Sequence, residues 1–495
     1  MERKSGILMH ISSLPNPYGL GSLGKEAYRF IDFLKAGGQT YWQVLPITPT
    51  NYGDSPYQSS SVYAYNPYFI DFDMLNKMGV LYKKDYKKEY YGDNPLDADY
   101  ANLFYVKNKV LKKAKDYRNR YQKQFAKFKE ENASWLDGFA LYEAIKESFG
   151  YTAWNTWPDE YRLRDEKTIA KFAKKNHEQI EQKKFIQFLF AYQWKRLKKY
   201  ANKNGVKIIG DMPIYVAYDS ADVWANPGMF WLDENLNPVK VAGCPPDAFS
   251  PDGQLWGNPI YRYDLMKQDG YTWWVKRIKK SFEMFDVVRI DHFRGFAGYF
   301  TIPFGDETAR NGNWVEGPGY ELFKAVNKAI PNAQIIAENL GFLDESVHKL
   351  LDDCGYPGMY ITQFDFGNGY DYHPMQDGLI SNNVIYTGTH DNQTIQSWYN
   401  ELDDHLRYAV NEYFHIPADG KDANLKIIEG TMATNVDTCI IPLQDYIGLV
   451  DKDGRMNIPS TLGCNWRYRA LATDYNDKLA EYIYSITKKT NRLWG

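Results

Sequence analysis

The chain has 495 residues, of which 44% are hydrophobic, 24% charged and 16% aromatic, and its formal net charge is −3. This composition excludes an intrinsically disordered chain, and it provides no overall basic field that would draw the protein to nucleic acid or to an anionic membrane. The length exceeds that of a usual single domain, but one large barrel with insertions can accommodate it.

Cysteine usage and the N-terminal segment predict a cytoplasmic location. The four cysteines are widely spaced and form no CxxC pair, which is typical of a reducing compartment: Cys244, Cys354, Cys439 and Cys464. The first apolar stretch is interrupted by polar residues within 10–13, so it is too short for a signal peptide. Since no run of about 18 apolar residues occurs, we expect no membrane-spanning helix.

Eight short apolar runs recur along the chain, separated by longer segments with helical periodicity. They comprise residues 6–14, 40–47, 206–214, 287–293, 333–340, 358–366, 384–390 and 438–449. Nearly continuous apolarity, as in residues 206–211, is typical of parallel strands that are covered on both faces. Eight such strands predict an α/β fold, a (β/α)₈ barrel, although a doubly wound sheet gives a similar pattern.

The uneven spacing of the runs predicts three insertions within a single catalytic domain spanning residues 1–495. Residues 71–200 have apolar positions at helical spacing and predict a mainly helical insertion after the second strand. Its lysine-rich stretches, such as residues 112–115, indicate a solvated helix face. We expect residues 215–285 to form a loop-rich insertion over the active site, and residues 293–332 to form a smaller one after the fourth strand.

The segment from Arg289 to Gly295 reads Arg-Ile-Asp-His-Phe-Arg-Gly and ends the fourth apolar run. Arg289 and Asp291 share one face of a strand, because they are two residues apart. The neighbouring guanidinium favours the ionised form of the Asp291 carboxylate, as a nucleophile requires. A purely structural ion pair at a strand end is the alternative for this segment alone.

Further acidic residues stand at the ends of other runs. Asp211 ends the third run, Glu338 the fifth, and His390-Asp391 the seventh. A barrel gathers the C-terminal ends of its strands at one mouth, so these residues and Asp291 become neighbours in space. Such a group of like charges destabilises a core, and it therefore favours an active site over a structural role.

Glycosyl transfer is the chemistry that suits several carboxylates without an evident metal or phosphate motif. A retaining enzyme uses an ionised carboxylate as nucleophile and a protonated one as general acid and later base. Asp291 beside Arg289 suits the first role, and Glu338, which follows apolar residues, suits the second. Asp391 is the candidate for stabilising positive charge at the sugar ring, and His390 for donating to a sugar hydroxyl.

Several motifs give the chain a specific resemblance that runs nearly from end to end. They are residues 11–15 (ISSLP), 42–46 (WQVLP), 55–57 (SPY), 210–216 (GDMPIYV), 245–247 (PPD), 253–259 (GQLWGNP), 289–295 (RIDHFRG), 337–341 (AENLG) and 389–392 (THDN). With them the chain resembles the 4-α-glucanotransferases, also called amylomaltases or disproportionating enzymes, of glycoside hydrolase family 77. This family is related to the α-amylase barrels.

The resemblance implies that Asp291 is the nucleophile, Glu338 the general acid/base and Asp391 the transition-state stabiliser. It also implies a substrate-binding set, in which the first four residues line the donor-sugar subsite: Tyr57, Asp211, Arg289, His390, Asp247, Trp256 and Asn339. Asp247 and the loop up to Trp256 are expected over the cleft, where residues 249–256 would hold an acceptor sugar and exclude water. No cofactor or metal is expected.

Departures from the family pattern are few. Asn339 stands where many members carry Asp, and Ser460 and Cys464 stand where Gly is usual, in a stretch near the acceptor side. The predicted activity is transfer of α-1,4-glucan segments to the 4-hydroxyl of another maltooligosaccharide or glucan. An α-amylase-type hydrolase and a glycan-binding barrel without turnover are the alternatives. Donor length, cyclic products and oligomeric state are not predicted.

Overall fold

The computed structural model describes residues 3–51, 53–246, 250–341, 343–366, 375 and 379–493. Its centre is a parallel sheet with the strand order β10-β11-β12-β1-β2-β3-β6-β9. The strands are β1 (Lys4–Leu8), β2 (Tyr41–Gln43), β3 (Lys207–Met212), β6 (Val287–Ile290), β9 (Ile335–Ala337), β10 (Gly358–Ile361), β11 (Asn383–Tyr386) and β12 (Thr438–Pro442). The predicted (β/α)₈ barrel is confirmed.

The first and last strands of this order adjoin through irregular hydrogen bonds. The amide of Ala337 donates to the carbonyl of Pro357 at 2.9 Å, and the amide of Met359 donates to Asn339 Oδ1 at 2.7 Å. Asn339 is the second residue after β9, so its side chain connects the ends of β9 and β10. The sheet thereby curls into a nearly closed ring of parallel strands.

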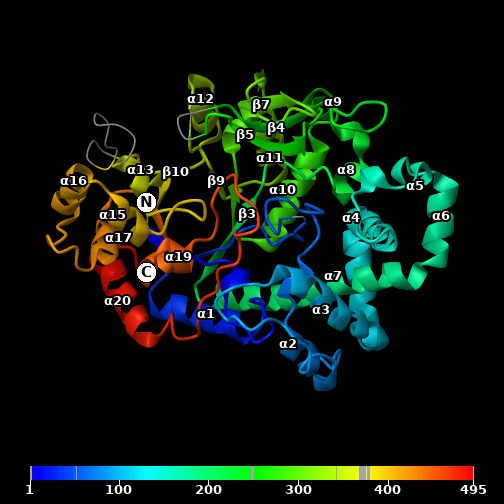
Figure 1. The fold of residues 1–495 in the computed structure, drawn as a ribbon, viewed down its shortest axis with the longest axis horizontal. Helices are drawn as coiled ribbons and strands as arrows, with labels where there is room; N and C mark the ends of the chain where they lie inside the picture. The colour runs from blue at the N-terminus through cyan, green and yellow to red at the C-terminus, as the bar shows by residue number, and fades with distance from the viewer. Residues whose placement is uncertain are drawn as a thin grey trace.

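Helices surround this ring (Figure 1). Those in the connections between strands, or after the last one, are α1 (Lys25–Ala36), α7 (His177–Lys203), α10 (Thr272–Met284), α11 (Gly319–Ala329), α12 (Glu345–Cys354), α13 (Thr362–Asp365), α15 (Ile395–Glu401), α16 (Asp404–Phe414), α17 (Ala423–Ala433), α18 (Leu443–Tyr446), α19 (Asp451–Gly454) and α20 (Asp477–Lys489). Helix α1 buries Phe30, Ile31 and Leu34 on one face, at the spacing that an amphipathic helix requires.

The connection between β2 and β3 carries most of the remaining helices. They are α2 (Phe72–Lys77), α3 (Tyr100–Lys112), α4 (Gln122–Ser148), α5 (Asp159–Arg162) and α6 (Glu166–Lys175), followed by α7. Helix α4 packs along α7, and α4 to α6 extend to one side of the barrel (Figure 1). The segment for which we expect a helical insertion, residues 71–200, spans these elements.

A second, antiparallel sheet lies beyond one end of the barrel and was not predicted from the sequence. Its order is β5-β4-β7-β8, with β4 (Lys240–Cys244), β5 (Gln254–Pro259), β7 (Gly298–Pro303) and β8 (Asn313–Glu316). Strands β4 and β5 come from residues 215–285, which also hold α8 (Ala221–Ala225) and α9 (Tyr263–Gln268), whereas β7 and β8 come from residues 293–332. The two segments thus join into one layer over a small core that includes Val241 and Ile302.

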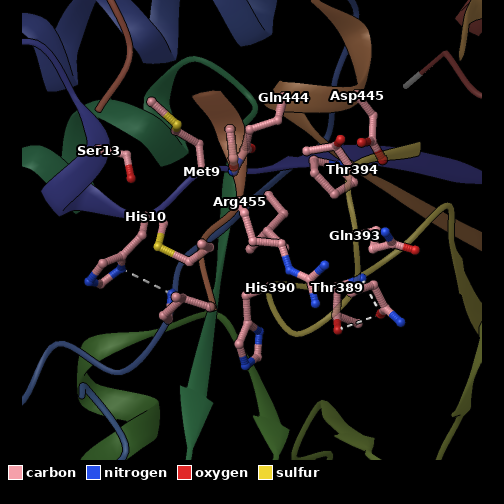
Figure 2. A pocket seen from close by; sticks show the side chains of 16 residues that line it. Met9, His10, Ser13, Thr389, His390, Gln393, Thr394, Gln444, Asp445 and Arg455 are labelled. Atoms are coloured by element: carbon pink, nitrogen blue, oxygen red, sulfur yellow. Dashed lines mark hydrogen bonds between the residues drawn. The ribbon is translucent and has the colours of Figure 1, made fainter. Parts of the chain in front are cut away.

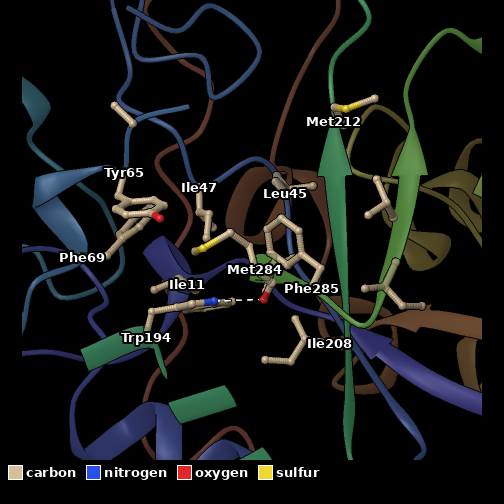
Figure 3. Close-up of a cluster of buried hydrophobic side chains, with 14 of the residues drawn as sticks. Ile11, Leu45, Ile47, Tyr65, Phe69, Trp194, Ile208, Met212, Met284 and Phe285 are labelled. Carbon is tan, nitrogen blue, oxygen red and sulfur yellow. Dashed lines mark hydrogen bonds between the residues drawn. The ribbon is translucent and has the colours of Figure 1, made fainter. Parts of the chain in front are cut away.

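Close packing beside β3 fixes the position of the first acidic residue of the site. A side chain at Gly210 would place its Cβ 2.1 Å from the ring of Phe285, so only glycine allows this ring to approach β3. Figure 3 shows Phe285 among Ile208, Met212 and Met284 in the buried cluster at this point. Asp211, which follows Gly210, is therefore held on a tightly packed strand.

The two ends of the chain meet in the barrel. β1 pairs in parallel with β12, in the register Lys4↔Thr438, and also with β2. The buried side chain of Arg492 donates to the carbonyls of Lys4 at 3.0 Å and Asp437 at 3.2 Å, where both strands begin. Among the described residues, no helix is long and apolar enough to cross a membrane.

Candidate active site

Asp211, Arg289 and Asp291 meet at the C-terminal ends of β3 and β6. Asp211 and Arg289 are register partners on these parallel neighbours, so their side chains lie beside each other. Arg289 Nη1 lies 2.8 Å from each carboxylate oxygen of Asp211 and 3.0 Å from Asp291 Oδ1. Burial raises the pKa of Asp211, and the Arg289 guanidinium opposes that shift. The Arg289 guanidinium therefore forms hydrogen bonds with both the Asp211 and the Asp291 carboxylates.

Glu338 lies directly after β9, on the strand next to β6. Its Oε2 accepts a hydrogen bond from the amide of His292, and its Oε1 accepts one from the amide of Leu340, both at 2.7 Å. Burial raises the pKa of Glu338 to about 7; Asp291 adds to the rise, whereas Arg289 and the two amides oppose it. At neutral pH this side chain can therefore either give or take a proton.

His390 and Asp391 follow β11 in a turn that brings Asp391 to the same mouth. The turn is closed by Asn392 Oδ1, which accepts from the amide of Thr389 at 2.8 Å. His390 Nε2 lies 3.3 Å from Asp391 Oδ2. The other carboxylate oxygen of Asp391 accepts from Asn457 Nδ2 at 2.6 Å. These contacts fix the orientation of the Asp391 side chain.

Two residues of the C-terminal segment hold Asp391 and were not among the predicted site residues. Asn457 contacts its side chain, and Arg455 Nη2 donates to its backbone carbonyl at 3.0 Å. Arg455 is itself paired with Asp451, with 2.6 Å between Nη1 and Oδ2. Sequence reasoning missed them because contacts between segments far apart in the chain have no local pattern.

Tyr57 stands between the carboxylates and an aromatic layer. Its hydroxyl donates to Asp211 Oδ2 at 2.8 Å, and its ring stacks on that of His390 with 5.0 Å between centroids and 15° between planes. Burial raises the pKa of Tyr57 well above its ordinary value, with contributions from Asp211, Asp291 and Asp391. The phenol is thus neutral and can donate. Tyr57 thus connects Asp211 with His390.

Trp256 lies on β5 of the antiparallel sheet and faces the end of β6. Its ring meets that of His292 edge to face, with 4.8 Å between centroids, and its carbonyl accepts from Gln58 Nε2 at 3.4 Å. The second sheet therefore reaches the residue that follows the predicted nucleophile. Asn339 is placed between β9 and β10, as described above, and Asp247 lies outside the described residues.

A small cavity lies behind His390, inside the barrel mouth (Figure 2). His10, shortly after β1, and Asp445, on α18 directly after β12, line it together with Ser13 and Arg455. Burial lowers the pKa of His10 to about 3 and raises that of Asp445 to about 7. Both side chains are therefore able to remain uncharged beside the site. A second cavity is lined by Tyr57 and Asp211 and extends toward α10.

No potential metal site was found among the residues that the structure describes: no group of three or more His, Cys, Asp or Glu side chains is arranged to hold a metal ion. The chemistry of the site can be derived from the carboxylates themselves. Asp291 is a carboxylate beside a guanidinium, Glu338 is a buried acid with a raised pKa, and Asp391 is a third, oriented carboxylate. This arrangement is suited to acid/base and nucleophilic chemistry.

Comparisons with known proteins agree with this arrangement. A family model described as 4-alpha-glucanotransferase matches residues 9–473. The chain is 45% identical to a 4-alpha-glucanotransferase of Clostridium butyricum over 484 residues, covering 97% of this chain and 99% of that protein. It is 44% identical to one of Streptococcus pneumoniae, covering 99% and 98%.

Solved structures show the same likeness. The amylomaltase of Streptococcus agalactiae, in complex with acarbose, superimposes with a TM-score of 0.96 at 40% identity, covering all of both chains. The amylomaltase of Corynebacterium glutamicum shares the fold with a TM-score of 0.77 at 18% identity, covering 99% of this chain and 75% of that one. This protein belongs to the 4-alpha-glucanotransferase family, glycoside hydrolase family 77.

Proposed function

We propose that this protein transfers α-1,4-glucan segments from a donor maltooligosaccharide or glucan to the 4-hydroxyl of an acceptor glucose or glucan. The observation that carries this proposal is the contrast between two neighbouring carboxyl groups. Asp291 Oδ1 accepts a hydrogen bond from Arg289 Nη1 at 3.0 Å, whereas burial raises the pKa of Glu338 to about 7. A retaining glycosyl-transferring enzyme needs this division between nucleophile and acid.

The reaction proceeds by double displacement. A carboxylate oxygen of Asp291 attacks the anomeric carbon while the glycosidic carbon–oxygen bond breaks, and Glu338 gives its proton to the departing oxygen. A covalent glucosyl ester of Asp291 remains. Glu338, now ionised, takes the proton of the acceptor 4-hydroxyl as that oxygen attacks the anomeric carbon. The ester bond breaks, and Asp291 is free again.

The surrounding side chains bind and orient the donor sugar. Asp391 stabilises the positive charge that develops at the ring, while His390 donates to a sugar hydroxyl. Tyr57 supplies an aromatic face and, with Arg289, holds Asp211 in place. We assign substrate contacts to Asp211 and Arg289 as well, because their polar groups surround the same position at the barrel mouth.

Transfer requires that an acceptor sugar competes with water, which is present at roughly 55 M, and good positioning supplies effective molarities above that. We assign this task to residues 249–256, including Trp256, whose ring lies against His292. Asp247 belongs to the same proposal. For Asn339, a substrate contact would use the amide nitrogen, because its oxygen accepts from Met359.

The relatives support this function. Those that match this chain over nearly its whole length are 4-alpha-glucanotransferases, and the similar amylomaltase structure contains acarbose. A reducing compartment, the cytoplasm, is the proposed location, and the four cysteines fit it because none of them forms a disulfide within the part of the chain that the structure describes.

Incubation of the pure protein with maltotriose tests the function. Transfer yields glucose together with a ladder of shorter and longer maltooligosaccharides, which chromatography resolves. Shorter products alone would indicate an α-amylase-type hydrolase, and no change with measurable maltotriose binding would indicate a glycan-binding barrel. Either of these two results would contradict the proposal.

A further inference from the structure

Trp466 has an unusual backbone conformation beside the site. Its φ is +66°, in the left-handed region that bulky residues rarely adopt, and its side chain is buried. The indole lies 5.7 Å from the ring of Tyr57 and 5.9 Å from that of His390, measured between centroids. A strained conformation persists only where the surrounding structure imposes it. The contacts of Trp466 therefore identify what holds it.

A short pairing between distant segments fixes this backbone. Residues 96–98 of the β2–β3 connection lie antiparallel to residues 467–469, with two backbone hydrogen bonds of 3.0 Å. Immediately beside this pairing, the hydroxyl of Tyr100 donates to the carbonyl of Trp466 at 3.1 Å. The amide of Trp466 donates to the carbonyl of Met456 at 2.7 Å. The backbone amide and the backbone carbonyl of Trp466 therefore both take part in hydrogen bonds.

An ion pair sets the register of the same two segments. Arg467 Nε donates to Asp97 Oδ1 at 2.8 Å, and Nη2 contacts the other carboxylate oxygen, so the pair is bidentate. Both side chains are more than a third exposed, so solvent screens their attraction. Their contribution is geometric, because a bidentate pair allows only one alignment of the segments.

The two rings that the indole contacts, Tyr57 and His390, are themselves in contact with carboxylates of the site. Tyr57 donates to Asp211, which shares Arg289 with the nucleophile Asp291. His390 lies 3.3 Å from Asp391. A shift of either ring against Trp466 would therefore move the donor-sugar contacts and the carboxylates that they hold.

We propose that Trp466 is a positioning residue for glycosyl transfer, held in its left-handed conformation by the pairing of residues 96–98 with 467–469 and by the Tyr100 hydroxyl. Its ring keeps Tyr57 and His390 in their stacked arrangement. The inserted segment after β2 thereby takes part in the chemistry without touching the sugar. This inference rests on the proposed glucan transfer.

Three substitutions at Trp466 separate the ring from the backbone. Trp466→Ala and Trp466→Gly both remove the ring, but only glycine adopts a positive φ without strain. We expect both to lower kcat for maltotriose disproportionation by about 30-fold, more than they raise KM, because small misplacements act mainly on the transition state. Trp466→Phe retains a ring and should recover kcat to within about fivefold of the natural protein.

A matched pair of hydroxyl deletions tests what holds the backbone. Tyr100→Phe removes the donor to the Trp466 carbonyl, and we expect kcat to fall by about threefold to tenfold. Tyr468→Phe is the control, because the Tyr468 hydroxyl is buried in the same region and has no hydrogen-bond partner among the residues that the structure describes. This variant should keep the natural kcat. Circular dichroism and melting temperature are measured for all variants, and kcat is expressed per folded molecule.

The outcomes are distinct. If Trp466→Ala or Trp466→Gly does not fold, the kcat values of Trp466→Phe, Tyr100→Phe and Tyr468→Phe still test the inference. Natural kcat in Tyr100→Phe and in every folded Trp466 variant, with loss of activity in Tyr57→Phe, overturns the inference while leaving the function intact. Absence of a maltooligosaccharide ladder from the natural protein would instead contradict the proposed function.

Discussion

Pairing between neighbouring barrel strands positions part of the acidic cluster of this site, whereas its aromatic residues come from the connections between those strands. Asp211 and Arg289 meet because β3 and β6 are parallel neighbours in a fixed register. Tyr57, Trp256 and Trp466 come from three separate connections and are held by individual hydrogen bonds and ring contacts. Under the proposed function, the barrel strands place the attacking carboxylate, while the connections hold the sugar and the acceptor.

The largest expected effect is that of Asp291→Asn, which tests the contribution of the barrel strands to activity. We expect kcat to fall by about 10⁴-fold or more, because the amide cannot form the covalent ester. The melting temperature and maltooligosaccharide binding should be retained. Asp453→Asn, an exposed position on α19, serves as the control and should retain full activity. Comparable activity in the two variants would remove the nucleophile assignment.

Glu338→Gln addresses the proton transfer, with an expected loss in kcat of about 10³-fold. In the natural protein the first step needs protonated Glu338, whose pKa is about 7, so kcat/KM should decline as pH rises through that value. An α-maltosyl fluoride donor needs little protonation of its leaving group, so it should restore glucosyl-enzyme formation in the variant without this alkaline decline. A decline that persists in the variant would assign the titration to another group.

Substitution in the inserted sheet should change the choice of acceptor more than the rate. Trp256→Ala is expected to raise the ratio of hydrolysis to transfer by about threefold to tenfold, since water then competes better with the acceptor. Reducing-end and ladder analysis measure that ratio. Trp231→Ala removes an exposed indole from the same inserted segment and should leave it unchanged. An unaltered ratio in both variants would argue against a role of the sheet in excluding water.

The smallest expected effect is a change in stability caused by a substitution at Ser460, in the segment after β12. Ser460 has φ +63°, and glycine is the residue suited to that conformation. Ser460→Gly should therefore stabilise the protein by about 0.5 kcal/mol, seen as a slightly higher melting temperature, with kcat unchanged. Ser485→Gly, on the exposed face of α20, should have the opposite sign, because glycine disfavours a helix interior. Destabilisation by both changes would contradict the strain at Ser460.

The sequence predicted the barrel and the acidic strand ends because both follow local rules. A buried parallel strand has a continuous apolar run, and the residues at or just after its C-terminal end lie at the mouth, which located Asp211, Asp291 and Glu338. The antiparallel sheet escaped prediction because its partners come from two segments whose short strands are half exposed. The roles of Asn457 and Trp466 escaped it because they depend on contacts between residues far apart in the chain.

The pairing of β1 with β12 has a consequence for synthesis of the protein. Residues 4–8 leave the ribosome well before one of their two strand neighbours, residues 438–442, which follows more than 400 positions later. Until then β1 has an unpaired edge, and His10, which lines the cavity behind His390, lacks the β12 side of its surroundings. Arg492, which donates to carbonyls at the start of both strands, is made later still. The barrel mouth is therefore completed only after β12 has been translated.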